Sequence, residues 1–252
     1  MTFFGSTTHM AATLEITNLT QNPMNIQNED LHIQGFSSSQ SWSFENAFHW
    51  FSPPSRIHKL LAQYDLYQKI VHLPGEIIEL GVYKAASLIR FATFRQTLEN
   101  DNARKIIGFD AFGPFPREHV SLASDQQFIE DFEKNGGHGL SLEEVASIFR
   151  HKGITNIELI AGNVMQTLDV FLENSPATRI ALLHLDMDVK EPTQYALQRL
   201  YDRVVPQGLI VIDDYGTVAG ATEAVDQFAH MHGLKLQKKP HYKIPAYIQK
   251  PF

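Results

Sequence analysis

Two short apolar runs, each followed by a pair of aspartates, constrain the fold of this chain more than any other feature. They are residues 179–185, followed by Asp186 and Asp188, and residues 208–212, followed by Asp213 and Asp214. Uninterrupted apolar runs of this length are typical of buried strands in a parallel sheet, and the helical pattern between them predicts a strand–helix–strand unit. Neighbouring parallel strands end at the same edge of a sheet, where open α/β sheets bind ligands, so the four carboxylates are expected to lie close together.

Four carboxylates at one edge repel one another, which costs stability. A hard divalent cation such as Mg²⁺ prefers oxygen ligands and would offset this repulsion. The alternative interpretation is that the aspartates are solvated residues that cap the helices after each strand. Two acidic pairs at the ends of adjacent strands favour the metal site.

The composition is that of one soluble domain with a substantial core. The chain has 252 residues, 43% of them hydrophobic, and α/β domains of this size are common. A net charge of −7 without a basic stripe argues against nucleic acid as a partner. The absence of cysteine excludes disulfides and thiolate ligands and fits a reducing compartment. We find neither a secretory signal at residues 1–10 nor an apolar run that could span a bilayer, so we expect a cytoplasmic protein with no membrane partner.

Strands alternate with helices along most of the chain. Besides the two runs above, strands are predicted at residues 76–82, 105–109 and 157–160, helices at 55–71, 85–98, 142–151, 167–172, 192–204 and 222–232, and a terminal hairpin at 234–237 and 242–249. This order predicts an α/β fold with a doubly wound, Rossmann-like sheet and a C-terminal β-hairpin. Residues 113–139 are predicted to be irregular because they contain Gly and Pro clusters, and loops of that length are usually functional or disordered.

Residues 1–52 are expected to form a partly ordered N-terminal extension, and residues 53–252 the main domain. Within the extension, residues 44–51 form an aromatic cluster that must cover something. Packing on the core is the favoured interpretation, and a lid over the site or a dimer contact is the functional alternative. The oligomeric state stays open between a monomer and a homo-oligomer.

A second candidate site follows the first strand. Glu79, Gly81 and Ser87 lie on the strand end, its turn and the start of the next helix, and Asp110 ends the second strand. A glycine in such a turn lets the backbone approach a ligand, and the helix start offers free N–H groups. The turn is not G-x-G-x-x-G, so a dinucleotide is poorly supported. S-adenosylmethionine fits better, since Glu79 can face its cationic groups and a carboxylate at the position of Asp110 accepts hydrogen bonds from ribose hydroxyls.

With these motifs the chain resembles the macrocin O-methyltransferase (TylF) group, which are Mg²⁺- and S-adenosylmethionine-dependent enzymes that methylate sugar hydroxyls in natural-product pathways. The resemblance covers roughly residues 53–250. It depends on the segments 74–83, 108–112, 161–163 with 167–168, 183–188 with Thr193, and 211–215 with Gly220 and 224–226.

The resemblance implies a class I methyltransferase fold for residues 53–252 and a role for each motif residue. It implies that Asp186, Asp213 and Asp214 bind the metal and that Asp188 is the general base. The residues that it implies for cofactor binding are Glu79, Gly81, Val82, Tyr83, Ser87, Asp110 and Asn163. Where the family has Gly-Gly before the serine, this chain has Ala85 and Ala86, and the family's Gly-Asp is Gly162-Asn163 here.

Methyl transfer to a hydroxyl needs help chiefly at the acceptor, because an alcohol is barely ionised near neutral pH. A cation at the acceptor oxygens lowers that pKa and a nearby carboxylate removes the proton, so a small-molecule diol, sugar or catechol is the expected acceptor. His184 is the rival base, deeper in the same strand as Asp186. Two other functions compete: a haloacid-dehalogenase-like phosphatase, from the Asp186-x-Asp188 pattern, and a catalytically inactive binding scaffold.

Overall fold

The protein is described by a computed structural model that covers residues 12–17 and 30–252. Its main sheet has eight strands in the order β1-β6-β5-β4-β7-β8-β10-β9. The strands are β1 (Ala12–Ile16), β4 (Glu76–Leu80), β5 (Ile106–Asp110), β6 (Ile157–Ala161), β7 (Ile180–Leu185), β8 (Val204–Ile212), β9 (Leu236–Lys238) and β10 (Ala246–Gln249). The short strands β2 (His32–Ile33) and β3 (Phe36–Ser37) pair separately.

The centre of the sheet is parallel. Strand β4 pairs in parallel with β5 on one side and β7 on the other, and β7 pairs in parallel with β8. The chain therefore reverses its winding direction between β4 and β7, the place where doubly wound sheets open a crevice for ligands. β10 lies antiparallel between β8 and β9, which confirms the terminal hairpin.

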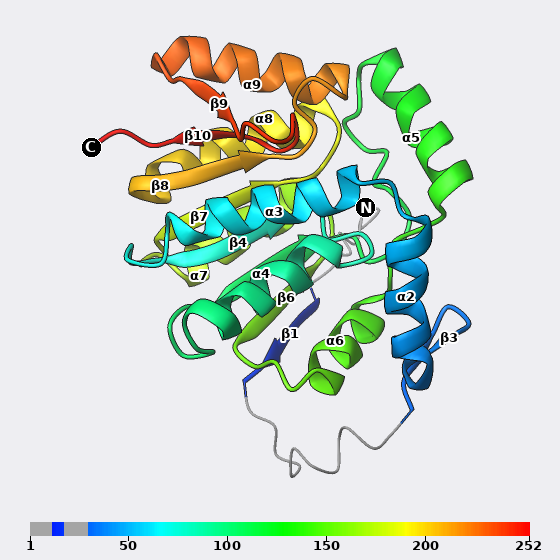
Figure 1. Ribbon diagram of the computed structural model, residues 1–252. Coiled ribbons are helices and arrows are strands. Elements are labelled where there is room, and N and C mark those ends of the chain that lie inside the picture. Colours follow the sequence, from blue (N-terminus) through cyan, green and yellow to red (C-terminus); the bar gives the residue numbers. More distant parts are fainter. Residues whose placement is uncertain (1–11, 18–29) are drawn as a thin grey trace, which may run out of the picture.

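Helices cover both faces of the sheet, so the architecture has three layers (Figure 1). On one face lie α3 (Ser55–Gln68), α4 (Ala86–Leu98) and α6 (Leu142–His151); on the other lie α7 (Val164–Asn174), α8 (Lys190–Leu200) and α9 (Ala219–His232). Every residue of β7 is buried, as expected for a strand covered on both faces. The doubly wound α/β fold predicted from the alternating pattern is thus confirmed.

The prediction of irregular structure for residues 113–139 is wrong. This segment contains the helix α5 (Ala123–Gly136), which ends at the Gly136-Gly137 pair. Phe128, Ile129 and Phe132 recur at helical spacing within it, and Ile129 packs with Val120 and Val189. The glycines and prolines that suggested a loop lie at the two ends of the segment and so bound the helix instead of breaking it.

The aromatic cluster at residues 44–51 does not pack on the core as favoured from the sequence. It lies on α2 (Ser41–Phe51), where Trp50 and Phe51 are 70% and 80% exposed. The extension nevertheless contributes to the sheet, because β1 pairs antiparallel with β6. The remaining predictions for the extension, partial order and a lid over the site, fall partly on residues 1–11 and 18–29, outside the described residues.

The described helices also bear on membrane association. Among residues 12–17 and 30–252, no helix combines the length and the apolar character needed to cross a bilayer.

Candidate active site

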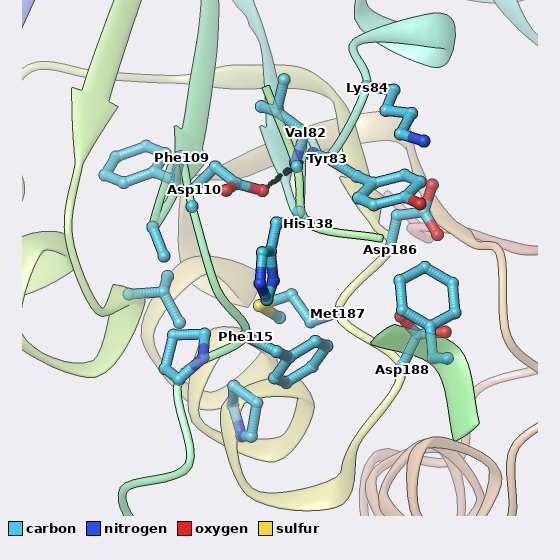
Figure 2. Close-up of a pocket in the computed structure, with 18 of the residues that line it drawn as sticks. Val82, Tyr83, Lys84, Phe109, Asp110, Phe115, His138, Asp186, Met187 and Asp188 are labelled. Carbon is cyan, nitrogen blue, oxygen red and sulfur yellow. Dashed lines mark hydrogen bonds between the residues drawn. The ribbon is translucent and has the colours of Figure 1, made fainter. Parts of the chain in front are cut away.

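A cavity of about 470 Å³ opens at the carboxyl ends of the parallel strands. Figure 2 shows Asp110 on one side of it and Asp186 and Asp188 on the other. Of the site residues predicted from the sequence, those that line this cavity are Gly81, Val82, Tyr83, Ser87, Asp110, Asn163, Asp186, Asp188, Asp213 and Asp214. Two motifs more than a hundred residues apart in the chain thus share one wall, because β4 and β7 are neighbours in the sheet.

Glu79 is the one predicted site residue that is not part of the cavity wall. Its side chain is fully buried, where its Oε1 accepts hydrogen bonds from Ser87 Oγ and lies 2.9 Å from His184 Nδ1. Its Oε2 has no hydrogen-bond partner among the described residues. Glu79 therefore supports Ser87 and His184 from beneath the wall.

Gly81 is required by a close backbone approach. Its φ is +93°, and a Cβ atom there would lie 1.8 Å from the carbonyl oxygen of Asp186. No side chain can be accommodated at that distance, so glycine lets the turn after β4 rest on the end of β7. The sequence suggested that this glycine lets the backbone approach a ligand, but the contact with the backbone of Asp186 is enough to require it.

Asp110 organises the turn after β4. Its Oδ2 accepts hydrogen bonds from the backbone N–H groups of Val82 and Tyr83, at 2.7 and 2.8 Å (Figure 2). Its Oδ1 accepts one from the backbone N–H of Phe112 at 2.6 Å. A carboxylate has about four lone pairs, so room is left for a ligand hydroxyl. Asn163 has a comparable structural role, since its side chain accepts a hydrogen bond from Met165 N at the start of α7.

The opposite side of the cavity is a cluster of carboxylates, which we call the carboxylate rim: Asp186, Asp188, Asp213 and Asp214. Oxygens of Asp186, Asp213 and Asp214 lie within 4.8 Å of one another. Burial, together with the charges of its neighbours Asp213 and Asp214, raises the pKa of Asp186 well above its usual range. Burial and the nearby Asp188 and Asp213 raise the pKa of Asp214 in the same way.

Asp213 has partners that the other rim residues lack. Burial opposes its ionisation, but the neighbouring His184, whose Nε2 lies 3.7 Å from Asp213 Oδ1, and the charge of Lys59 lower the pKa of Asp213 to about 2. Lys59 Nζ, from α3, lies 2.5 Å from Asp213 Oδ2. Asp213 Oδ1 is buried without a hydrogen-bond partner among the described residues.

The two candidate bases differ in access to the cavity. Asp188 lines it, and burial together with the charge of Asp186 raises the pKa of Asp188 to about 7. His184 is fully buried and does not line it. Burial alone would lower the pKa of His184, but the neighbouring carboxylate of Asp213 and the hydrogen-bonded carboxylate of Glu79 raise it to about 10.

Sequence reasoning missed the residues that reach the cavity from outside the motifs. Arg56 and Lys59 on α3, Arg90 on α4, and Phe115 and His138 at the two ends of the α5 segment all line it. No local pattern marks them, because their positions depend on how α3 and α5 pack over the sheet.

Sequence comparison agrees with this geometry. Residues 55–244 match the family described as macrocin-O-methyltransferase (TylF). The chain belongs to that family. It is 28% identical, over 164 residues and 64% of its length, to the 8-demethyl-8-(2,3-dimethoxy-alpha-L-rhamnosyl)-tetracenomycin-C 4'-O-methyltransferase of Streptomyces olivaceus. The match spans 60% of that relative, and the other curated relatives are covered to a similar extent.

Solved structures show the same fold. The O-methyltransferase NovP superposes with a TM-score of 0.68 at 22% identity, covering 78% of this chain and 81% of NovP. CalS11, described as a TDP-rhamnose 3'-O-methyltransferase of calicheamicin biosynthesis, gives a TM-score of 0.59 at 25% identity, covering 83% of this chain and 86% of CalS11. The fold of this TylF-family chain is that of the class I methyltransferases, which depend on S-adenosylmethionine.

The phosphatase alternative is not favoured. A haloacid-dehalogenase fold needs its Asp-x-Asp nucleophile after the first core strand, but Asp186 and Asp188 follow β7, after the parallel strands β4, β5 and β6.

Proposed function

We propose that this protein is a metal-dependent O-methyltransferase that transfers a methyl group from S-adenosylmethionine to a hydroxyl of a sugar or another diol-bearing natural-product acceptor. The observation that carries the proposal is the convergence of Asp186, Asp213 and Asp214 on the cavity that also contains Gly81 and Asp110. Membership of the TylF family and the sugar O-methyltransferases among its relatives support the same activity.

The residues of the rim fit a divalent cation. The raised pKa values of Asp186 and Asp214 show that the carboxylates are crowded, and the buried Asp213 Oδ1 lacks a partner. Hard cations such as Mg²⁺ bind through carboxylate oxygens of this kind. Asp186, Asp213 and Asp214 would hold the ion, which when bound supplies Lewis-acid stabilisation of the ionised acceptor hydroxyl.

The cofactor is assigned to the opposite side of the same cavity. Asp110, next to the turn at Val82 and Tyr83, would accept hydrogen bonds from the ribose, and Asn163 at the start of α7 would lie near the adenine. Gly81 and Ser87 would face the amino-acid part of the cofactor. The role of Glu79 is indirect, because it holds Ser87 from below.

Asp188 is proposed as the general base that accepts the acceptor proton. It lines the cavity beside the rim, whereas His184 is enclosed by Glu79, Asp213 and the ring of Phe91. A base must come within hydrogen-bond reach of the proton that it removes, which supports Asp188. Cytoplasmic location, a small-molecule acceptor as the sole partner, a lid formed by residues 1–52 and the homo-oligomeric alternative remain predictions.

A labelled methyl-transfer assay tests the proposal. Sugars, nucleotide sugars, glycosides and catechols are offered with labelled S-adenosylmethionine, in EDTA and again after excess Mg²⁺ is added. We expect transfer to at least one diol-bearing acceptor that disappears in EDTA and returns with Mg²⁺. Asp202→Asn, an exposed carboxylate near the start of β8, is the matched control for loss of one negative charge. Full turnover in EDTA would contradict the metal, and failure to bind S-adenosylhomocysteine would favour the inactive scaffold.

A further inference from the structure

One wall of the cavity is basic. Arg56 and Lys59 from α3 and Arg90 from α4 line it together with the carboxylate rim. The two helices pack side by side over the same face of the sheet (Figure 1). Three of the four lysines and arginines that line the cavity therefore come from these two helices, although the chain as a whole is acidic. The fourth, Lys84, donates to the carbonyl oxygen of Gly136.

Two of the three cations on α3 and α4 have no anionic partner among the described residues. Lys59 is paired with Asp213. Arg90 is half-buried and donates only to Gln63 Oε1, at 3.1 Å, while the side chain of Arg56 donates to no described residue. Burial and the nearby charge of Arg56 lower the pKa of Arg90, while the charges of Asp213, Glu79 and Asp186 act in the opposite direction.

The two buried arginines of the described chain, Arg95 and Arg104, have different surroundings. Arg95 donates to Asp101 at 2.9 Å and Arg104 to Glu99 at 2.8 Å, and both also donate to backbone carbonyl groups, although Arg95 Nε has no hydrogen-bond partner among the described residues. Each of these structural arginines thus has a carboxylate partner. Arg90, which is half-buried, and Arg56, which is exposed, have no such carboxylate partner among the described residues, and both line the cavity.

We propose that Arg56 and Arg90 form an oxyanion subsite that binds a phosphate or diphosphate group of the methyl acceptor. This inference depends on the proposed function and narrows its acceptor class to sugar phosphates and nucleoside-diphosphate sugars. The planar guanidinium group binds such oxyanions through two parallel hydrogen bonds. A bound phosphate would supply the anionic partner that Arg56 and Arg90 lack.

The carboxylate of the proposed cofactor is a second oxyanion that Arg56 and Arg90 could bind. The start of helix α4 offers that carboxylate other hydrogen-bond donors. Helix α4 begins at Ala86, and its N-cap residue Ala85 makes no capping hydrogen bond with its side chain. The free N–H groups of that first turn, at the cavity wall beside Ser87, suit a carboxylate. Arg90 lies one turn further along α4, within reach of the charges of Asp186 and Asp213, on the side where the acceptor is assigned.

Binding measurements in EDTA distinguish the two oxyanions that the arginines could bind, the acceptor diphosphate and the cofactor carboxylate, without involving the metal. The variants are Arg56→Gln and Arg90→Gln; Arg179→Gln, an exposed arginine at the start of β7 on the opposite edge of the sheet, controls for the lost charge. The probes are thymidine diphosphate, uncharged thymidine and S-adenosylhomocysteine, measured by calorimetry. Wild type should bind the diphosphate more tightly than thymidine, and each pocket variant should weaken the diphosphate by at least about tenfold while changing S-adenosylhomocysteine affinity by less than about twofold.

Three results would overturn the subsite. In the first, the pocket variants bind the diphosphate as well as Arg179→Gln does. In the second, S-adenosylhomocysteine affinity falls instead, which would assign the arginines to the cofactor carboxylate. In the third, wild type does not prefer the diphosphate to thymidine. A wild type that binds the diphosphate but not S-adenosylhomocysteine would contradict the proposed function and leave the subsite standing.

Kinetics and a conservative variant guard against misfolding. Arg90→Lys keeps the charge and loses only the planar fork, so its melting temperature should equal that of wild type while its diphosphate affinity falls less than that of Arg90→Gln. The kinetic test compares two acceptors with the same sugar, one a nucleotide sugar and the other its neutral methyl glycoside. KM for the nucleotide sugar should rise in both glutamine variants, while kcat/KM for the methyl glycoside stays unchanged. Equal losses for both acceptors would overturn the proposal.

Discussion

Asp110 and Asp214 both lie at the carboxyl ends of parallel strands on the wall of one cavity, yet their carboxyl groups have opposite surroundings. Asp110 accepts three backbone hydrogen bonds and stabilises the turn after β4 without any ligand. Asp214 faces Asp188 and Asp213, and its pKa is raised well above its usual range. The difference teaches that the side of the cavity around Asp110 is stabilised by the fold itself, while the carboxylate rim keeps crowded charge that a bound cation would offset.

The strongest test of this contrast removes one rim ligand. Asp213→Asn should abolish Mg²⁺-dependent turnover, because losing an anionic ligand weakens a hard-cation site and misplaces the acceptor. Affinity for S-adenosylhomocysteine should change much less, since its proposed contacts lie at β4 and β5. Turnover assays and calorimetry on the same preparation measure both, with Asp202→Asn as control. An equal loss of cofactor affinity would show that the two sides of the cavity are not independent.

The base assignment gives the next largest effect. Asp188→Asn keeps the size of the side chain and removes its capacity to accept a proton, so kcat should fall by about 10²–10⁴ with Mg²⁺ and cofactor binding nearly intact. Single-turnover kinetics measure this loss. Normal turnover in Asp188→Asn together with an inactive His184→Ala would assign the proton to the histidine.

On the cofactor side, Asp110→Ala should weaken S-adenosylhomocysteine binding by about 1.5–3 kcal/mol, the usual range for hydrogen bonds to a charged group. The structure adds that the same change frees the N–H groups of Val82 and Tyr83, so the melting temperature should fall as well. Calorimetry and thermal melts separate the two effects. Unchanged affinity would place the ribose elsewhere in the cavity.

The pH dependence of the metal-free protein tests the charge on the rim. The pKa of Asp188 is raised to about 7 in the folded protein, so the folded state holds this proton more tightly than the unfolded state. The free energy of unfolding is therefore highest below the usual pKa near 3.8 and falls as the pH rises through 7. Asp188→Asn in EDTA should therefore melt higher than wild type at pH 8, with the advantage shrinking at pH 5, by about 2–4 °C for each kcal/mol. Adding Mg²⁺ should raise the melting temperature of wild type at pH 8. If Asp188→Asn melts lower than wild type at pH 8, the ionised carboxylates of the rim do not destabilise the metal-free protein.

The smallest effect concerns the backbone of the cofactor turn. Ala85 has φ of 59°, in the left-handed region, where a non-glycine residue costs about 1–2 kcal/mol. Ala85→Gly should relieve this strain and stabilise the protein by up to about 1 kcal/mol after its own entropic cost. Ala86→Gly, one residue further and inside the helix, should destabilise by about 0.5–1 kcal/mol. Chemical denaturation compares the two, and effects of the same sign would show that the turn is not strained.

Much of the fold follows from local sequence. β7 and the second half of β8 are mostly apolar, and their aspartates appear where each strand ends, so their place at the ligand-binding edge could be predicted. The prediction failed where local signals were ambiguous. For the segment at 113–139, the terminal glycines and prolines predict irregular structure and mask the helical spacing of Phe128, Ile129 and Phe132.

The sequence by itself therefore determined which motif residues come together at the ligand-binding edge, because strand patterns and motif spacing are local properties of the chain. The tertiary structure alone decided what surrounds them. Lys59 reaches Asp213 across 154 positions of sequence, and Glu79 lies beneath the wall because strand pairing turns it toward Ser87 and His184. Such contacts depend on the packing of α3 and α4 over the sheet, and long-range packing leaves no periodic trace in a single sequence.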